Sequence, residues 1–444
     1  MNHDGRPEQG NDAWKGLRAA PEEVNFAPGV FEKCAILGEF DPKRPGRAHL
    51  LLKAMIEQNR RALAEGQLEL PGLREIYGDS QHRVTLPRSA LVIFPRYVNC
   101  SPDYVESDCT IHIVESLKRI VVDVRHFEGS DDILFKSEIR TQKCVVSALH
   151  ALQQQLESFR PELVVLDGNF VGNERTIQAE DVRELKKKYG FKLVIFVPDH
   201  YPHGPAANHA AYWNAVADKQ VVFTDYIPTD PDFDAGKLTR AWLVPFAEHL
   251  FKADATKDLP FVFVGTRHRL RELWCSYAAA TGVKSTVILH DRRAENTPSY
   301  GEFINIMARA QLTINSGWMG GDNHIMTGRI LEAILSNCAL VQHDFSALRQ
   351  FLIPFVHYLP YGNLHQVQHM VHFIAHAHET REQMVQDARE WVRKYYSSRG
   401  FWHHVLRSTL HPSGKLDFPP RSLFMRDCEG GYSAISSQNK YNLT

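Results

Sequence analysis

Residues 163–197 read LVVLDGNFVGNERTIQAEDVRELKKKYGFKLVIFV and contain two short apolar runs, at 163–166 and 192–197. Between them lies a polar stretch whose residues 176–189 follow a helical pattern. Short β-branched runs that alternate with helical patterns predict βαβ units, in which a parallel sheet is buried on both faces. This unit is the element from which Rossmann-like domains are built.

The same alternation extends along most of the chain. Further strands are predicted at 90–95, 120–124, 221–224, 261–264, 285–289, 312–315 and 339–342. Helices are predicted at 104–117, 133–159, 206–217, 270–280, 300–309, 328–336 and 364–396. A segment rich in Pro and Asp, residues 226–260, interrupts the series and reads as a connection. The sequence therefore predicts an α/β protein with two Rossmann-like domains that face each other across a cleft.

The regions outside the two series set the domain boundaries. A strong helical pattern at 49–68 belongs to an N-terminal extension, and the residues after 400 are expected to cross back onto the first domain. The predicted parts are a tail and helical extension (1–87), a first Rossmann-like domain (88–245), a linker (246–259), a second Rossmann-like domain (260–400) and a C-terminal crossover and tail (401–444).

The composition excludes several classes of protein. The chain has 444 residues, 51 Lys and Arg against 52 Asp and Glu, and a net charge of −1, so no overall field attracts nucleic acid. The seven cysteines form no C-x-x-C pair, which argues against a zinc knuckle or a redox pair. No export signal and no run of 18 apolar residues is found, so we expect a cytoplasmic protein without a transmembrane segment.

The polar residues that follow the predicted strands are the candidates for chemistry. Ligands of open parallel sheets bind outside the carboxyl ends of the strands, where helix N-termini present unpaired N–H groups. In the first half, Asp167 follows the run at 163–166, and Asp199 and His200 follow the run at 192–197. A carboxylate or an imidazole at such a place can act as a general base.

In the second half, the Gly265-Thr266-Arg267 turn directly follows a strand and precedes a helix. The glycine lets the backbone approach a phosphate, and the arginine can donate charge-assisted hydrogen bonds. The turn is neither a Walker loop nor a G-x-G-x-x-G fingerprint, so the sequence does not support an ATPase or a dehydrogenase.

A Gly-rich loop, residues 317–321, leads to a helix that we expect to begin near Thr327 as N-cap. Arg329 lies in the first turn of this helix and Glu332 one turn further on. A carboxylate at that position of a helix that points at a cleft can accept hydrogen bonds from a ribose diol.

The second half resembles the nucleotide-sugar-binding domain of GT-B glycosyltransferases, in particular the CgeB-like group and the glycosyl transferase group 1 type of C-terminal domain. The resemblance is carried by FVFVG (261–265), SYGEFINIMARAQLTINSG (299–317), TGRILEAILSNCALVQ (327–342), HYLPYGN (357–363) and AREWVRKYYS (388–397). It implies transfer of a sugar from a nucleotide-diphosphate donor, with UDP- or GDP-sugar as co-substrate and without a metal or other cofactor. Glu332 matches the ribose-binding glutamate, and Gly265 and Arg267 match the turn that faces the phosphates.

The candidate residues of this enzyme fall into two groups. The catalytic base candidates are Asp199, His200 and Asp167. The donor-binding candidates follow the strands or line the loops of the second half: Gly265, Thr266, Arg267, Asn315, Ser316, His324, Thr327, Arg329, Glu332, Tyr361 and Asn363. His324 stands where retaining relatives carry a second glutamate, so the sequence leaves the stereochemistry open.

Two other functions remain open at this point. The same fold serves sugar-nucleotide epimerases, and the missing second glutamate together with the long N-terminal extension also suits a non-catalytic assembly or regulatory module. The donor base, the sugar, the acceptor and the oligomeric state are not readable from the sequence. Four histidines, at 365, 369, 372 and 376, share one helical face, but they flank an apolar stripe and are expected to pack rather than to bind a metal.

Overall fold

The fold is described from a computed structural model of the chain. It describes residues 37, 40–66, 85–134, 142–169, 176–198, 209–223, 228, 230–241, 243–252, 255–320, 323–324, 326–349 and 351–410. None of the helices within these ranges is long and apolar enough to cross a membrane.

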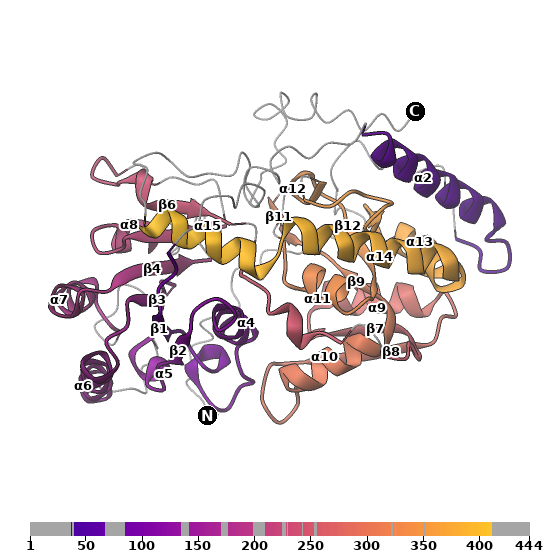
Figure 1. Ribbon diagram of the computed structural model, residues 1–444. Coiled ribbons are helices and arrows are strands. Elements are labelled where there is room, and N and C mark those ends of the chain that lie inside the picture. The colour runs from indigo at the N-terminus through magenta and orange to yellow at the C-terminus, as the bar shows by residue number, and fades with distance from the viewer. Residues whose placement is uncertain are drawn as a thin grey trace, which may run out of the picture.

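The first domain is built on a parallel sheet. Within the described ranges its strands lie in the order β2-β1-β3-β4-β5-β6, and every neighbouring pair is parallel (Figure 1). The strands are β1 (Ser89–Ile93), β2 (Asp123–His126), β3 (Leu163–Asp167), β4 (Lys192–Val197), β5 (Lys219–Val222) and β6 (Leu238–Arg240). The helices are α4 (Asp108–Leu117), α5 (Ser130–Leu134), α6 (Gln142–Phe159), α7 (Ala179–Tyr189) and α8 (His209–Asn214). All residues of β3 are buried, as predicted for a sheet covered on both faces.

Three predicted elements of this domain differ from the structure. The strand predicted at 120–124 begins only at Asp123, because Val122 is 90% exposed in the preceding bend. The helix predicted over 133–159 consists of two helices, α5 and α6. The segment predicted as a connection, 226–260, contains β6, whose Leu238 is fully buried in the core of the first domain.

The second domain repeats the architecture. Its described strands form a parallel sheet in the order β13-β12-β9-β7-β8. They are β7 (Leu259–Thr266), β8 (Ser285–His290), β9 (Ala310–Asn315), β12 (Ala339–His343) and β13 (Leu359–Tyr361), and a separate antiparallel pair is formed by β10 (Trp318–Gly320) and β11 (Asn323–His324). The helices are α9 (Arg269–Ala279), α10 (Tyr300–Arg309), α11 (Arg329–Leu335), α12 (Ser346–Arg349), α13 (Leu364–His376) and α14 (His378–Tyr395). The pattern at 364–396 is thus two helices, which are interrupted at Ala377.

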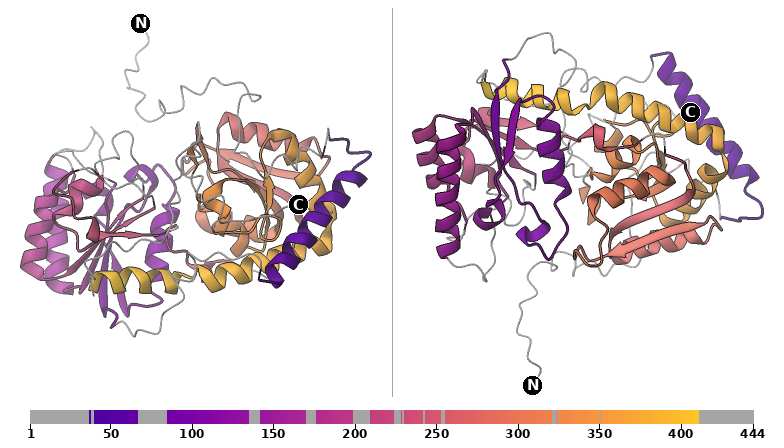
Figure 2. Two further views of the ribbon diagram at one scale, coloured as in Figure 1. Left: turned by 90° about the horizontal axis from the view of Figure 1, so that it is seen from above. Right: turned by 60° about the horizontal axis from the view of Figure 1, so that its bottom comes forward.

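The last described helix, α15 (Ser398–Leu410), returns to the first domain as expected. It follows α14 along one side of both domains and packs on α4, β4 and β5 (Figure 2). The indole Nε1 of Trp402 donates to Ser116 Oγ at 2.8 Å, and the hydroxyls of Ser408 and Thr239 lie 2.9 Å apart. Two parallel-sheet domains joined by such a crossover confirm the GT-B architecture that the resemblance implies.

The N-terminal helix α2 (Gly46–Ala64) packs on the second domain, although the first domain is nearer in sequence (Figure 1). Leu52 and Ile56 are buried against α13, and Asn59 Nδ2 donates to the carbonyl of Pro354 at 2.9 Å. The sequence predicts this helix, but only the structure shows that it completes the core of the second domain.

Histidines gather where α2 meets α13. His49 Nε2 lies 3.0 Å from His372 Nδ1, and the rings of His372 and His376 are 4.3 Å apart. In the described part of the chain no group of three or more His, Cys, Asp or Glu is arranged to hold a metal ion. Burial, together with His376, His49 and His369, lowers the pKa of His372 to about 4.

We expect the docking of α2 to weaken as the pH falls from 6.5 towards 4. A histidine whose pKa is lowered in the docked state takes up a proton more readily when α2 is released, so each protonation in this window favours release. Hydrogen-exchange protection of the α2 amides, corrected for intrinsic rates, should therefore be lower at pH 5 than at pH 7. The amides of α7 serve as the control, and equal losses in both helices would contradict the prediction.

Candidate functional site

The carboxylate of Glu332 lies at the boundary between the two domains and is 5% exposed. Its Oε2 accepts a hydrogen bond from Arg329 Nε at 3.1 Å, and its Oε1 accepts a longer one, of 3.4 Å, from the hydroxyl of Tyr300. Burial raises the pKa of Glu332 to about 7, although Arg329 opposes this effect. The site thus holds a carboxylate that titrates near neutral pH.

Arg329, which is bonded to this carboxylate, lies close enough to two further arginines to affect the pKa of one of them, and we call Arg271, Arg292 and Arg329 the arginine cluster. Arg271 Nη1 donates to the carbonyl of Thr266 at the end of β7, at 2.9 Å. Burial and the charges of Arg329 and Arg292 lower the pKa of Arg271 to about 10. Burial and the three arginines also lower the pKa of His290, at the end of β8. Like charges held this close repel one another, and an anion bound between them would relieve that repulsion.

Arg329 is held by contacts on several sides. Its Nη2 donates to the carbonyl of Val264, and its guanidinium lies over the rings of Phe263 and Phe303, at 5.6 and 5.1 Å from their centroids. Its Nη1 is buried and has no hydrogen-bond partner among the described residues. One donor of this guanidinium therefore has no acceptor among the described residues, which is unusual for a buried polar group.

Arg292 lies in a loop that contacts the first domain. Its backbone φ is 68°, in the left-handed region that residues other than Gly rarely adopt. Its carbonyl accepts a hydrogen bond from the N–H of Val105 at 3.1 Å, and Arg293 lies over the ring of Tyr104 at 4.5 Å. The loop after β8 thus joins the two domains beside the arginine cluster, and strained residues of this kind often occur at functional sites.

The predicted phosphate-facing turn lies at the end of β7, but its arginine points elsewhere. A Cβ on Gly265 would come within 3.1 Å of the Phe263 ring, so this position favours glycine. The side chain of Arg267 is 69% exposed, and its Nη1 lies 3.5 Å from Glu272 Oε1. The structure therefore brings Arg271, rather than Arg267, to the cluster.

Several predicted donor-binding residues form a supporting layer beneath the site. Asn315 Nδ2 donates to Thr327 Oγ1 at 2.9 Å and to Gln342 Oε1 at 2.7 Å. The hydroxyl of Tyr361, which is also bonded to Ser316, donates to the carbonyl of Asn315 at 2.9 Å. These contacts fix the end of β9 next to the start of α11.

Two capping positions differ from what the sequence suggests. The N-cap of α11 is Gly328 and not Thr327, because the Thr327 hydroxyl is bonded to the side chain of Asn315. Asn363 accepts a hydrogen bond from the N–H of Gln366 at 3.0 Å and thereby caps α13. The hydrogen bond of the Asn363 side chain thus stabilises the start of α13.

Of the three predicted catalytic bases, Asp167 lies within the described residues. Asp199 and His200 lie outside the described residues. Asp167 ends β3, is 7% exposed and accepts a hydrogen bond from the N–H of Asn169 at 3.0 Å. The backbone of His324 pairs with Trp318 in the β10–β11 hairpin, and its side chain is outside the description.

Sequence reasoning missed the residues that the first domain contributes. Asp108, the first residue of α4, is exposed, and its negative charge raises the pKa of both Glu332 and Tyr300 in the second domain. His112, one turn further along α4, has its Nε2 at 2.6 Å from the Tyr300 hydroxyl. The sequence does carry one signal for these residues: Ser107 is an N-cap residue, so it marks the start of a helix that follows the first strand.

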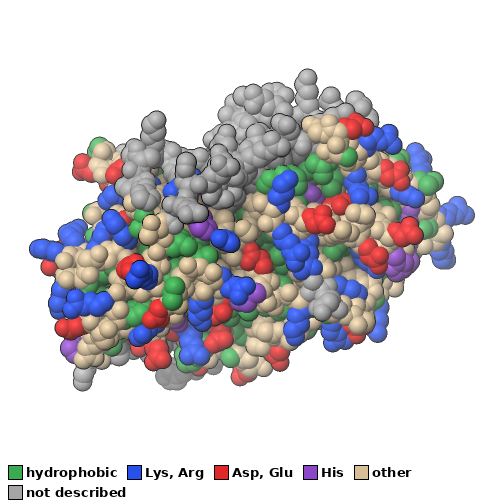
Figure 3. Space-filling view, in the orientation of Figure 1, with side chains coloured by type: hydrophobic (Ala, Val, Ile, Leu, Met, Phe, Trp, Pro, Cys, Tyr) green, Lys and Arg blue, Asp and Glu red, His purple; other side chains and the backbone are tan. Residues whose placement is uncertain are grey.

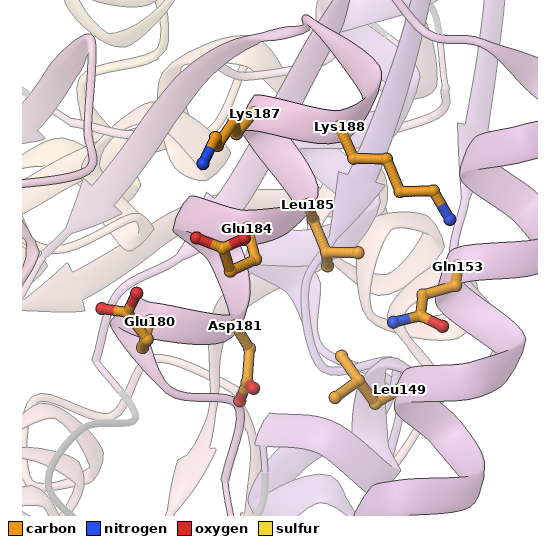
Figure 4. A pocket seen from close by; sticks show the side chains of 8 residues that line it. All are labelled: Leu149, Gln153, Glu180, Asp181, Glu184, Leu185, Lys187 and Lys188. Atoms are coloured by element: carbon orange, nitrogen blue, oxygen red, sulfur yellow. The ribbon is translucent and has the colours of Figure 1, made fainter.

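Two surface cavities among the described residues lie away from this site. A cavity of about 520 Å³ lies between α6 and α7, on the side of the first domain remote from the second (Figures 1 and 4). Another, of about 540 Å³, lies between α14 and residues that precede or begin β7, β9 and β12, which is the end of the second sheet opposite the cluster. The face in Figure 3 carries intermingled positive and negative side chains.

Comparison with known proteins gives one family match and several similar structures. The model of a family described as "Glycosyl transferase-like" matches residues 240–407. The glycosyltransferase of Rickettsia africae ESF-5 and the HepE protein of Anabaena bound to UDP-glucose are each 11% identical, cover 73% of this chain and 99% of their own, and have a TM-score of 0.47. Sucrose-phosphate synthase of Thermosynechococcus elongatus is 11% identical, with 73% and 98% covered and a TM-score of 0.47. No curated protein matches the sequence.

Proposed function

We propose, starting from the glycosyl transferase-like match over residues 240–407, that this protein transfers a sugar from a nucleotide-diphosphate-sugar donor to an acceptor hydroxyl. The observation that carries the proposal is the arginine cluster. Three mutually repelling cations lie in the first turn of α9, in the loop after β8 and at the start of α11, and the last of them, Arg329, is bonded to the buried carboxylate of Glu332. A diphosphate has the charge and the acceptor oxygens that such a cluster requires.

In this proposal each part of the site binds a different part of the donor. The arginine cluster binds the diphosphate, with Arg329 Nη1 free to donate. Glu332 accepts hydrogen bonds from the ribose diol, since a carboxylate has about four lone-pair sites and two donors of the described residues, Tyr300 and Arg329, occupy part of them. Fixed positive charges stabilise the leaving diphosphate, so the reaction proceeds without a metal ion.

The first domain supplies the base. Asp108 is an exposed carboxylate on the opposite side of the domain boundary, close enough to Glu332 to alter its pKa. It takes the proton of the acceptor hydroxyl as that oxygen attacks the anomeric carbon and the bond to the diphosphate breaks, so the sugar is transferred with inversion. Asp199 and His200 remain predictions for the same role.

A panel of donors tests the function. Thermal midpoints measured with UDP-, GDP-, dTDP- and CMP-sugars should rise for one nucleotide class, because a ligand that binds only the folded state adds about 2.7 kcal/mol of stability at 100 times its Kd. With the donor that binds, transfer of the sugar to water or to a mixture of acceptors is then measured. No rise with any member of the panel would contradict the proposal and favour a non-catalytic module.

We expect Arg271→Ala to weaken binding of the donor nucleotide about 10- to 100-fold, the loss of one charge-assisted hydrogen bond to phosphate. The matched comparison is Arg267→Ala, which removes the same charge from an exposed side chain. Arg267 is the arginine to which the sequence analysis assigns the phosphate. Calorimetry should therefore show a smaller effect for Arg267→Ala. The reverse ranking would return the phosphate role to Arg267.

A further inference from the structure

His112 joins three parts of the protein. Its Nδ1 accepts the backbone N–H of Ala247 in the interdomain linker at 3.2 Å, and its ring packs on Phe246 and Phe251, with centroids 4.1 and 5.9 Å away. Because a backbone N–H only donates, the ring proton lies on Nε2, which therefore donates to Tyr300 at 2.6 Å. Burial lowers the pKa of His112 to about 3, so the ring is neutral.

Tyr300 continues the chain of hydrogen bonds into the second domain. Its hydroxyl oxygen accepts from His112, which leaves its own proton to be donated to Glu332 Oε1. The hydrogen bonds of this network all point the same way: the linker amide donates to His112, His112 donates to Tyr300, and Tyr300 donates to the carboxylate. Polarised chains of this kind strengthen their successive bonds.

The linker also packs against the start of the helix that carries this carboxylate. A Cβ on Gly328 would lie 3.2 Å from Cζ of Phe246 and 4.0 Å from Oε1 of Glu332. Phe246 thus lies against the N-cap of α11, the helix that carries Glu332. The linker is therefore connected to Glu332 by the hydrogen bonds through His112 and Tyr300, and to the helix of Glu332 by the packing of Phe246.

We propose that His112 and Tyr300 are positioning residues, which couple the linker between the domains to Glu332 and hold its carboxylate in the orientation that the donor requires. The importance of this orientation rests on the proposed function, whereas the coupling itself does not. Neither residue touches the reacting atoms. The coupling makes the state of the donor site depend on how the first domain sits against the second.

The charged and titratable groups that face Glu332 determine how its pKa should respond to substitution. They are Arg329 on its own helix, Tyr300 on α10 and Asp108 on α4. The bond from Tyr300 favours the ionised carboxylate, so its loss in Tyr300→Phe should raise the midpoint at which Glu332 titrates. His112→Leu should raise it less, because Tyr300 can still donate, and His112→Gln, which retains an N–H at the end of the side chain, should restore it.

The coupling is tested by carboxyl ¹³C titration of Glu332 in the full-length protein, with the signal assigned by Glu332→Gln. The midpoint should rise in Tyr300→Phe, and adding His112→Leu to that variant should change nothing more, since the route through the hydroxyl is already broken. An unchanged midpoint in Tyr300→Phe, or additive effects in the double variant, would overturn the proposal. A purely structural role for these residues would not move this midpoint.

A second measurement separates the coupling from the proposed function. Binding of UDP and of GDP is measured by calorimetry at pH 7 and pH 9. Tyr300→Phe should bind the preferred nucleotide more weakly than the natural protein at pH 7, because a smaller fraction of its Glu332 is ionised, about fivefold smaller for a midpoint that rises by one unit from about 7. The difference should narrow at pH 9, where Glu332 is largely ionised in both. If the natural protein binds neither nucleotide and no sugar nucleotide of the panel, the proposed function fails, and the titration alone decides the coupling.

Discussion

Asp108→Asn is expected to lower kcat for sugar transfer by about 10²- to 10⁴-fold, the usual contribution of a general base. The amide has the shape of the carboxylate and can still accept the hydrogen bond from the N–H of Cys109, which Asp108 Oδ1 accepts at 2.8 Å, so the start of α4 should remain folded. Binding of the donor nucleotide should be retained, because Asp108 belongs to the first domain and contacts none of the arginine cluster in the bonds described. Single-turnover kinetics with the donor from the panel and calorimetry measure the two effects separately.

The other base candidates provide the controls for this experiment. Asp199→Asn, His200→Ala and Asp167→Asn are prepared alongside, and their thermal midpoints are compared first. If Asp108 is the base, its variant alone loses the chemical step at unchanged donor affinity. If transfer is retained in Asp108→Asn and lost in Asp199→Asn or His200→Ala, the base is one of the residues predicted from the sequence.

Arg329→Met should have an effect on both activity and stability. The substitution removes a cation placed at the developing charge of the leaving diphosphate, for which we expect a loss of about 10²- to 10³-fold in kcat/KM. It also leaves the buried carboxylate of Glu332 without its ionic partner, which typically costs about 3–5 kcal/mol of folding free energy. Without Arg329 the pKa of Glu332 rises further, so the folded variant takes up a proton and the loss of stability should be smaller at pH 6 than at pH 8. Urea unfolding at the two pH values checks this sign.

The double variant Arg329→Met/Glu332→Gln separates the two roles of the pair. Replacing both partners of a buried ion pair by neutral side chains of similar shape is often close to neutral for stability. The double variant should therefore regain most of the unfolding free energy of the natural protein, whereas transfer should stay lost. A double variant that regained activity would contradict the assignment of this pair to the donor site.

Much of the fold was predictable because its signals are local. Runs such as LVVL and KLVIFV form buried strands wherever the helices between them can cover a sheet, and they did so at 163–167 and 192–197. The crossover of α15 and the position of Glu332 in α11 also follow from pattern and resemblance. Strand β6 was missed, because three residues in a segment rich in Pro and Asp give no periodic signal.

The amino-acid sequence by itself determined two parallel-sheet domains and the placing of Glu332 and Arg329 on one turn of a helix, since the alternation of apolar strands with helical patterns and the spacing within a helix are both visible in short stretches of sequence. Only the tertiary structure decided which arginine turns inward at the end of β7, because Arg267 and Arg271 lie on the same short stretch and differ only in the neighbours they meet. It also decided that Asp108 and His112 of the first domain lie against Tyr300 and Glu332 of the second. Contacts between residues about 190 to 220 positions apart leave no periodic trace in a sequence, because they arise from how two finished domains pack.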